Sequence, residues 1–318
     1  MIINVHAHLN RRELTSDKGW DYAAEGLAKR AGISKEIIIN NTLKPYFTTK
    51  SHFAEAYIKV LNNAGIDKAI ITAMDLGLSA AGEPKWSIEE INHWIAKQAE
   101  EYPDKLVTLC AVDPRRGERA IKLLEKAISE WGMKGVKLHP TAGFYPDDPK
   151  FFPFYKKCIE FNVPIYSHVA ALTPLLAQSK YADPIYLDSV AINFPELKII
   201  MLHFGGLSWT NKCVEIMCSR PNIYTEISTH QINVISMPQM WLTTLRTILD
   251  TPTMLGAPLK DRIMFGSDWP FLEYALNEAD WVKWIKNIPE KGKGYDLKFE
   301  NREISKILGE NAKKILKF

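Results

Sequence analysis

Eight short runs rich in isoleucine and valine alternate along this chain with longer, charged amphipathic segments. The runs cover residues 2–9, 68–74, 106–112, 135–139, 164–168, 198–203, 222–228 and 262–267. Strands that alternate with helices predict a parallel sheet, because each helix crosses back over the sheet before the next strand begins. Eight strands are the number that closes a (β/α)₈ barrel. We therefore expect an α/β fold in which residues 1–318 form one TIM-barrel domain.

Two connections are too long for a simple crossover between neighbouring strands. Residues 10–50 follow the first run, and residues 229–261 follow the seventh. In a barrel both connections leave strand ends at the same mouth, so we expect long loop insertions there that form a lid or wall over a pocket. Residues 301–318 predict a last amphipathic helix.

Composition narrows the class of function. The chain has 40 Lys and Arg residues against 37 Asp and Glu, a balance that argues against a nucleic-acid or membrane-surface partner. Its N-terminal residues lack the basic and apolar regions of a signal peptide, and no run approaches the roughly 18 apolar residues of a membrane span. Four cysteines without a close pair fit a reducing compartment. We expect a cytoplasmic enzyme that acts on a small molecule.

Histidines gather at the ends of the predicted strands. His6 and His8 are two residues apart at the end of the first run, so both side chains project to the same face of the strand. Such a pair chelates one metal ion or forms a hydrogen-bonded pair, and this spacing alone does not separate the two. His139, His168 and His203 end the fourth, fifth and sixth runs. Barrel active sites lie at these strand ends, so a shared site is the better interpretation.

The eighth run supplies a carboxylate at the same mouth. Asp268 directly follows this buried run, where an unpaired aspartate would cost several kcal/mol of desolvation. A metal held by neutral histidines needs a carboxylate to complete its ligands or to take a proton from bound water. The alternative is that Asp268 caps the helix or turn that follows.

These motifs, taken in order, resemble the amidohydrolase-related family of the amidohydrolase superfamily. The resemblance rests on His6-x-His8 and on residues 135–140 (GVKLHP), 164–168 (PIYSH), 203–206 (HFGG) and 265–270 (FGSDWP). That family includes metal-dependent barrel hydrolases and nonoxidative decarboxylases similar to aminocarboxymuconate semialdehyde decarboxylase. The resemblance implies one divalent ion, most often zinc, with Mn²⁺ or another divalent ion as the alternative. It also implies a homodimer.

The resemblance further implies a role for individual residues. His6, His8, His168 and Asp268 would hold the ion, and His203 would be the catalytic histidine near the bound water and the substrate. Asp268 would also act catalytically, because it is placed to exchange a proton with that water.

Two positions need separate treatment. Relatives often begin with Asp-x-His-x-His, whereas this chain has Asn4 two residues before His6, which changes the support of the ligands rather than the ligands themselves. Lys137 lies on the same face as His139. Lys137 either binds an anion or forms a salt bridge within the barrel, or it is carboxylated and bridges two metal ions. We expect an uncarboxylated lysine and therefore a mononuclear site.

Substrate contacts are the least constrained part of the prediction. His139 and Lys137 are expected to contact the substrate, and Arg246 in the seventh connection to clamp a substrate carboxylate. Glu226 and His230, near the end of the seventh run, are further candidates to face the pocket.

Three functions are compatible with these residues. The leading expectation is a hydrolase in which metal-activated water attacks a small amide, lactone or ester. The alternative is a nonoxidative decarboxylase of an aromatic or unsaturated acid, which would use the same ligands. A barrel that binds its ligand without chemistry is the third, and the complete set of candidate ligands argues against it.

Overall fold

Nine parallel strands form the centre of the part of the chain that the structure describes. The computed structural model describes residues 1–45, 52–172 and 176–317. The strands are β1 (Ile3–His8), β2 (Lys68–Thr72), β3 (Leu106–Thr108), β4 (Cys110–Ala111), β5 (Val136–Leu138), β6 (Ile165–His168), β7 (Ile199–Leu202), β8 (Ile223–Glu226) and β9 (Ile263–Met264). Each predicted run contains a strand, and the third run is split at Leu109 into β3 and β4. The predicted α/β barrel is confirmed.

Backbone hydrogen bonds close the strands into a barrel. The strands pair in the order β1-β2-β3 and β4-β5-β6-β7-β8-β9. Leu109 joins the two groups, because its N–H donates to the Ile71 carbonyl at 3.1 Å. At the opposite seam the Val5 N–H donates to the Phe265 carbonyl at 3.0 Å. The first strand therefore lies beside the last, as a closed barrel requires.

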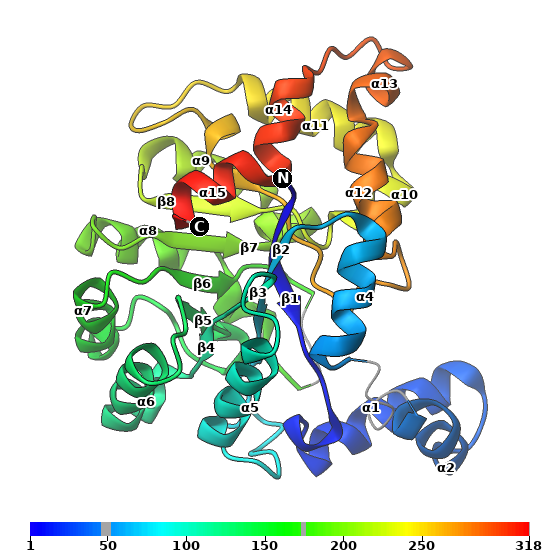
Figure 1. Ribbon diagram of the computed structural model, residues 1–318, viewed down its shortest axis with the longest axis vertical. Coiled ribbons are helices and arrows are strands. Elements are labelled where there is room, and N and C mark those ends of the chain that lie inside the picture. The colour runs from blue at the N-terminus through cyan, green and yellow to red at the C-terminus, as the bar shows by residue number, and fades with distance from the viewer. Residues whose placement is uncertain (46–51, 173–175, 318) are drawn as a thin grey trace.

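Helices surround the strands (Figure 1). Those that follow the strands in turn are α4 (Ala54–Ala64), α5 (Ile88–Glu100), α6 (Glu118–Ser129), α7 (Phe152–Glu160), α8 (Ile185–Asn193), α9 (Gly206–Ser219), α11 (Pro238–Asp250) and α12 (Glu278–Lys286). The chain ends in α13 (Ile288–Lys293), α14 (Asn301–Ser305) and α15 (Asn311–Leu316). Within the described residues, none of these helices has the length and apolar character needed to span a membrane.

Two apolar layers hold the barrel. One lies between strands and helices, and the other fills the barrel interior with Ile3, Val5, Ile70, Leu109, Tyr166, Ile200, Leu202 and Met264. Ala312 and Ile315 of α15 close the interior layer from the end at which the strands begin. The opposite end is left for polar side chains, and that is where the predicted site residues lie.

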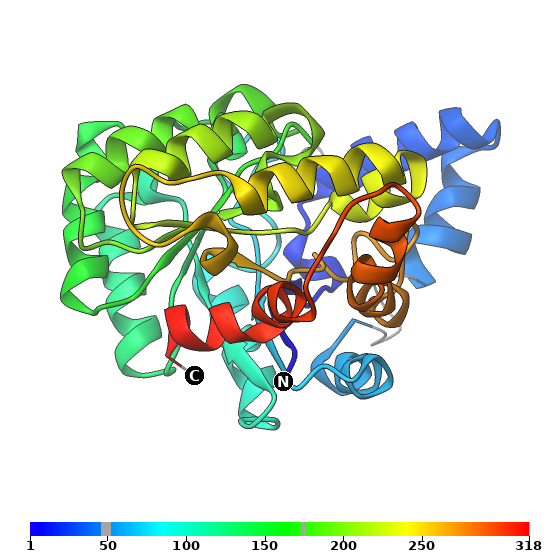
Figure 2. The ribbon, with the colours of Figure 1, turned by 90° about the horizontal axis from the view of Figure 1, so that it is seen from above.

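The two long connections are largely helical, which corrects the expectation of loop insertions. After β1 the chain forms α1 (Asp17–Ala31) and α2 (Lys35–Ile38), which extend to one side of the barrel (Figure 2). The Ser16 side chain caps α1, and apolar residues spaced four apart form a stripe that packs against α2 and the following turn. This insert has its own small core of Trp20, Ala24, Ala28, Ile38 and Leu43. After β8 the connection holds α10 (His230–Ser236) and α11.

A buried polar cluster fastens the seam between the first and last strands. The Asn4 amide donates to Tyr57 Oη at 2.9 Å, to Ser267 Oγ at 2.7 Å and to Glu278 Oε1 at 3.1 Å. Its carbonyl oxygen accepts from the N–H groups of His6 and Ser267. Glu278 is 2% exposed, and burial raises its pKa to about 7. An aspartate in place of Asn4 would set a second carboxylate against Glu278, which gives a physical reason for the amide.

Glu278 makes stability depend on pH. The folded chain binds the Glu278 proton more tightly than the unfolded chain does. The contribution of Glu278 to the free energy of unfolding is therefore full below pH 4.5 and is lost as the pH rises to about 7. Glu278→Gln removes this loss. We expect the cost of the substitution, measured by urea unfolding, to shrink between pH 5 and pH 8 by up to about 3 kcal/mol.

Glu290→Gln is the control, because Glu290 lies exposed on α13 and its side chain is 75% accessible. Its difference from the wild type should stay constant over the same pH range. If Glu278→Gln lowered the free energy of unfolding by the same amount at pH 5 and at pH 8, Glu278 would not be the source of the pH dependence.

Candidate metal centre

The strand ends bring the predicted site residues to one mouth of the barrel. His6 and His8 lie on β1, Lys137 on β5, His168 at the end of β6 and His203 directly after β7. Each of these five residues is at most 5% exposed. Parallel strands present their carboxyl ends at the same edge, so residues far apart in the chain meet there.

Three acceptor atoms converge at the end of β1. His6 Nε2 lies 3.0 Å from His8 Nε2, and Asp268 Oδ1 lies 3.2 Å from the His8 nitrogen and 3.6 Å from the His6 nitrogen. His6 Nδ1 lies 3.1 Å from a Glu226 oxygen, and His8 Nδ1 lies 3.1 Å from the Thr72 carbonyl. A carbonyl or carboxylate only accepts, so both Nδ1 atoms donate. In the neutral rings both Nε2 atoms then carry lone pairs.

This arrangement calls for a cation. Burial lowers the pKa of His6 and of His8, which keeps both rings neutral at neutral pH. Two nitrogen lone pairs and a carboxylate oxygen of Asp268 repel one another at these distances, and a positive charge among them relieves this repulsion. Two histidines and a carboxylate are ligands that Zn²⁺, Mn²⁺ and related divalent ions accept. The residues present therefore fit the divalent ion that the sequence predicts.

Lys137 adds a buried positive charge beside the same atoms. Its Nζ lies 3.2 Å from His6 Nε2, and the side chain is 1% exposed. Burial lowers the Lys137 pKa to about 8, while Asp268 and Glu226 favour the charged form. The lysine is thus placed either to bind an anion or to lose its proton near neutral pH.

Three further imidazoles form a second group next to these ligands. The rings of His139 and His168 stack with centroids 4.3 Å apart, and His203 Nε2 lies 2.9 Å from His168 Nδ1. Burial lowers the pKa of all three, that of His168 to about 3. His168 Nε2 lies 3.1 Å from the Leu172 carbonyl, so both ring nitrogens of His168 have partners within the protein. A role for His168 as fourth ligand stays a prediction. His139 Nδ1 lies 2.6 Å from Thr141 Oγ1.

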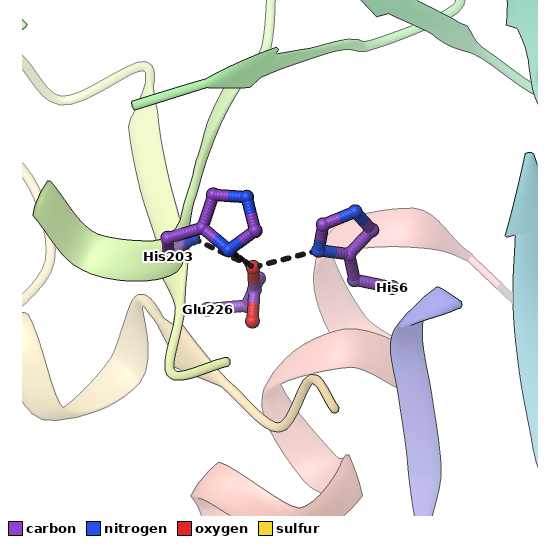
Figure 3. Close-up of side chains that lie close together, drawn as sticks. All are labelled: His6, His203 and Glu226. Carbon is purple, nitrogen blue, oxygen red and sulfur yellow. Dashed lines mark hydrogen bonds and ion pairs between the residues drawn. The ribbon is translucent and has the colours of Figure 1, made fainter. Parts of the chain in front are cut away.

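Glu226 on β8 lies between His6 and His203 (Figure 3). Its Oε1 accepts from the His203 backbone N–H at 2.7 Å and from Ser228 Oγ at 2.8 Å, and its Oε2 accepts from the Ser228 N–H at 2.5 Å. Burial raises the Glu226 pKa to about 7. His6, His203 and Glu226 are close enough together to hold an ion. We assign them to a hydrogen-bonded cluster instead, because donors from the protein already occupy both carboxylate oxygens.

Arg246 does not reach this mouth, which corrects the prediction that it clamps the substrate. Its guanidinium donates to both carboxylate oxygens of Asp250 and of Glu303 and to the Lys298 carbonyl. The residue instead fastens α11 to the segment around α14. The sequence contains no local signal for this contact, because Glu303 lies 57 residues away along the chain.

An apolar cavity of about 260 Å³ opens next to His8. Its wall includes Leu14, Trp20 and Leu43 of the insert, and Phe271 from the segment after β9. The Phe271 ring lies beside the His8 ring, with centroids 5.3 Å apart and the two ring planes tilted by 54°. The cavity joins an apolar wall to His8, one of the three converging residues, and an apolar wall with a few polar groups is the usual composition of a small-molecule site.

Backbone strain also marks this mouth. His203 has φ 69° and Asp268 has φ 58°, both in the left-handed region that residues other than glycine rarely adopt. Such conformations cost on the order of 1–3 kcal/mol and persist where the surroundings hold them. At these two positions the held conformation places a side chain of the site.

Comparison with known proteins agrees with the geometry. The sequence model of the family described as amidohydrolase matches residues 3–318. A γ-resorcylate decarboxylase from Polaromonas sp. is 23% identical over 270 residues, which cover 71% of this chain and 79% of that protein. A 2-keto-4-carboxy-3-hexenedioate hydratase from Sphingobium sp. is 25% identical over 175 residues, 47% of this chain and 50% of that protein.

A solved structure shows the same fold. The dihydroxybenzoic acid decarboxylase from Polaromonas sp. JS666, with bound manganese and the inhibitor 2-nitroresorcinol, superposes with a TM-score of 0.64 at 19% identity. The match covers 99% of this chain and 96% of that one.

Asp268→Asn tests the metal centre. Asparagine tolerates the left-handed backbone of this position but lacks the negative charge, so we expect Mn²⁺ binding to weaken while the fold persists. Added Mn²⁺ should raise the Tm of the wild type, with a stabilisation of about 2.7 kcal/mol at 100 times the Kd. It should raise that of Asp268→Asn much less, as differential scanning calorimetry can measure.

Asp296→Asn is a matched control, because Asp296 is exposed and has the same φ of 58°. Its Mn²⁺-induced shift should equal that of the wild type. If Mn²⁺ raised the Tm of the wild type and of Asp268→Asn equally, Asp268 would not be a metal ligand.

Proposed function

Because the chain belongs to the amidohydrolase family, we propose that it is a metal-dependent carboxy-lyase that releases carbon dioxide from a small aromatic or unsaturated carboxylic acid. The observation that carries this proposal is the convergence of His6, His8 and Asp268 beside the buried ammonium of Lys137. The decarboxylases among the relatives support it, since they match this chain over most of its length.

The charges at the mouth favour an anionic substrate. A divalent cation held by His6, His8 and Asp268, with His168 as the predicted fourth ligand, would attract a carboxylate and stabilise negative charge that develops on the substrate. With such an ion the site carries a net positive charge. The two positive charges of the ion and the one on Lys137 exceed the two negative charges of Asp268 and Glu226. A substrate carboxylate would neutralise this excess. Manganese in the related decarboxylase structure makes Mn²⁺ the first ion to test.

The apolar cavity orients the rest of the substrate. A carboxylate bound beside His8 would direct the hydrocarbon part toward Phe271 and the insert residues Trp20 and Leu43, because His8 lines the same cavity. A ring or conjugated chain buried there is removed from water. His139, stacked on His168 beside this group, is the further residue that we expect to contact the substrate.

Decarboxylation needs a proton at the carbon that loses its carboxylate. The carbon–carbon bond breaks, carbon dioxide leaves, and the electron pair of that bond is taken up by the substrate framework that accepted the proton. We assign the transfer of this proton to His203, whose Nδ1 lies 2.8 Å from Ser228 Oγ, so the ring orientation is set. Asp268 can share in the proton exchange, because it lies at the same mouth.

Hydrolysis, the leading expectation from the sequence, has less support than its alternative. The sequence relatives matched over 64–71% of this chain are decarboxylases, and several solved structures with the same fold are decarboxylases as well. Hydration is the second candidate, because a hydratase also matches part of the chain and the 4-oxalomesaconate hydratase from Rhodopseudomonas palustris superposes with a TM-score of 0.59. The two reactions differ in whether carbon dioxide is formed.

Release of carbon dioxide distinguishes these reactions. We expect the Mn²⁺-loaded protein to release carbon dioxide from hydroxybenzoic or unsaturated dicarboxylic acids, as monitored in a coupled bicarbonate assay. Amides, lactones and esters of similar size should stay intact. Hydrolysis or hydration without carbon dioxide in the same panel would reject the proposal.

His203→Asn tests the assigned proton transfer. Asparagine can hydrogen-bond to Ser228 but cannot carry a proton, so we expect kcat to fall by about 10²–10⁴ while KM changes little. His93→Asn is the control, because His93 lies exposed on α5 against Trp131, and it should keep wild-type kcat. An unchanged kcat in His203→Asn would place the proton transfer elsewhere.

A further inference from the structure

One oxygen atom of Glu226 contacts both halves of the site. Oε1 accepts from His6 Nδ1 at 3.1 Å, which lies on the ligand side, and from the His203 backbone N–H at 2.7 Å. It also accepts from Ser228 Oγ at 2.8 Å, and Ser228 in turn lies 2.8 Å from His203 Nδ1. Figure 3 shows the two histidines on either side of the carboxylate.

We infer that Glu226 is a positioning residue that sets His6 for metal binding and His203 for proton transfer through one carboxylate oxygen. The inference rests on the proposed function, because it assigns a metal ligand and a proton carrier. On the ligand side, Glu226 holds the His6 proton on Nδ1 and leaves Nε2 free for the ion. On the other side it acts on His203 through the backbone N–H and through Ser228.

The contacts of Glu226 require a carboxylate. All four groups that meet its two oxygens are donors, so an amide NH₂ in place of either oxygen would face a donor. The space is also specific to this side chain. A Cβ atom at Gly266 would lie 2.0 Å from Glu226 Oε2, so the carboxylate occupies room that any other residue at 266 would fill.

The backbone of His203 depends on the same oxygen. His203 has φ 69° and is followed by Phe204 with φ 45°, so two successive residues adopt the left-handed region. The hydrogen bond from the His203 N–H to Glu226 fixes the first of them. Loss of this acceptor would let the turn relax and the imidazole move away from His168.

Ser228 separates the two actions of Glu226. It lies 2.8 Å from His203 Nδ1 but 3.4 Å from His6 Nδ1, so the hydroxyl serves mainly the His203 side. Ser228→Ala therefore removes part of the support of His203 and leaves the hydrogen bond between His6 and Glu226 in place. It also removes no charge, so it is the milder variant if Glu226→Gln folds poorly.

The test measures Mn²⁺ affinity and turnover separately. Mn²⁺ binding is titrated by electron paramagnetic resonance, without substrate, and kcat is measured at saturating Mn²⁺. For Glu226→Gln we expect a Kd for Mn²⁺ that is 10–100-fold weaker and a kcat at least 10-fold lower. For Ser228→Ala we expect a lower kcat with a Kd within about threefold of the wild type.

Glu303→Gln is the control for loss of a buried carboxylate. Glu303 is 7% exposed and pairs with Arg246 away from the site, so this variant should lose stability but keep both Kd and kcat. A wild-type Kd in Glu226→Gln, or a wild-type kcat in Ser228→Ala, would overturn the inference. If the wild type itself binds no Mn²⁺ and releases no carbon dioxide, the proposed function fails instead.

Discussion

The meeting of three electron-pair donors at one point is the constraint on which the rest of this structure depends. His6 Nε2, His8 Nε2 and Asp268 Oδ1 can lie within 3.6 Å of one another only because each histidine ring is held by a hydrogen bond on its far side. Those bonds come from other strands, Glu226 on β8 and Thr72 on β2. The barrel therefore supplies the candidate metal centre with its geometry as well as its candidate ligands.

Closure of the barrel is the second requirement, because Asp268 and the histidines come from opposite ends of the chain. The Asp268 N–H donates to the His6 carbonyl at 2.9 Å, so the carboxylate is fixed to β1 by the seam itself. The cluster of Asn4, Ser267 and Glu278 strengthens the seam beside it. Fold stability and the placement of Asp268 are thus coupled at this position. A substitution that breaks the hydrogen bonds of the seam would both lower stability and displace Asp268.

Local patterns predicted the strands and the gathering of the candidate residues at one mouth of the barrel, whereas contacts that span the chain could not be foreseen. The His6-x-His8 spacing, together with histidines at the ends of other apolar runs, indicated a shared mouth because strand periodicity is local. Glu226 was only a candidate to face the pocket, since its contact with His6 spans 220 residues. The prediction that Arg246 contacts the substrate was wrong, because the local sequence pattern does not show its contact with Glu303, 57 residues away. The connection after the first strand was expected to be a long loop insertion, whereas its apolar residues Trp20, Ala24 and Ala28 form one face of α1 and pack with Ile38 and Leu43.

The insert after β1 packs around its own core of Trp20, Ala24, Ala28, Ile38 and Leu43, apart from the two layers of the barrel. It nevertheless contributes Trp20 and Leu43 to the wall of the cavity beside His8. The insert residues that line this cavity thus pack separately from the strands that carry the candidate ligands. A change within the insert can therefore alter the shape of the cavity while β1 and the residues that support it stay in place.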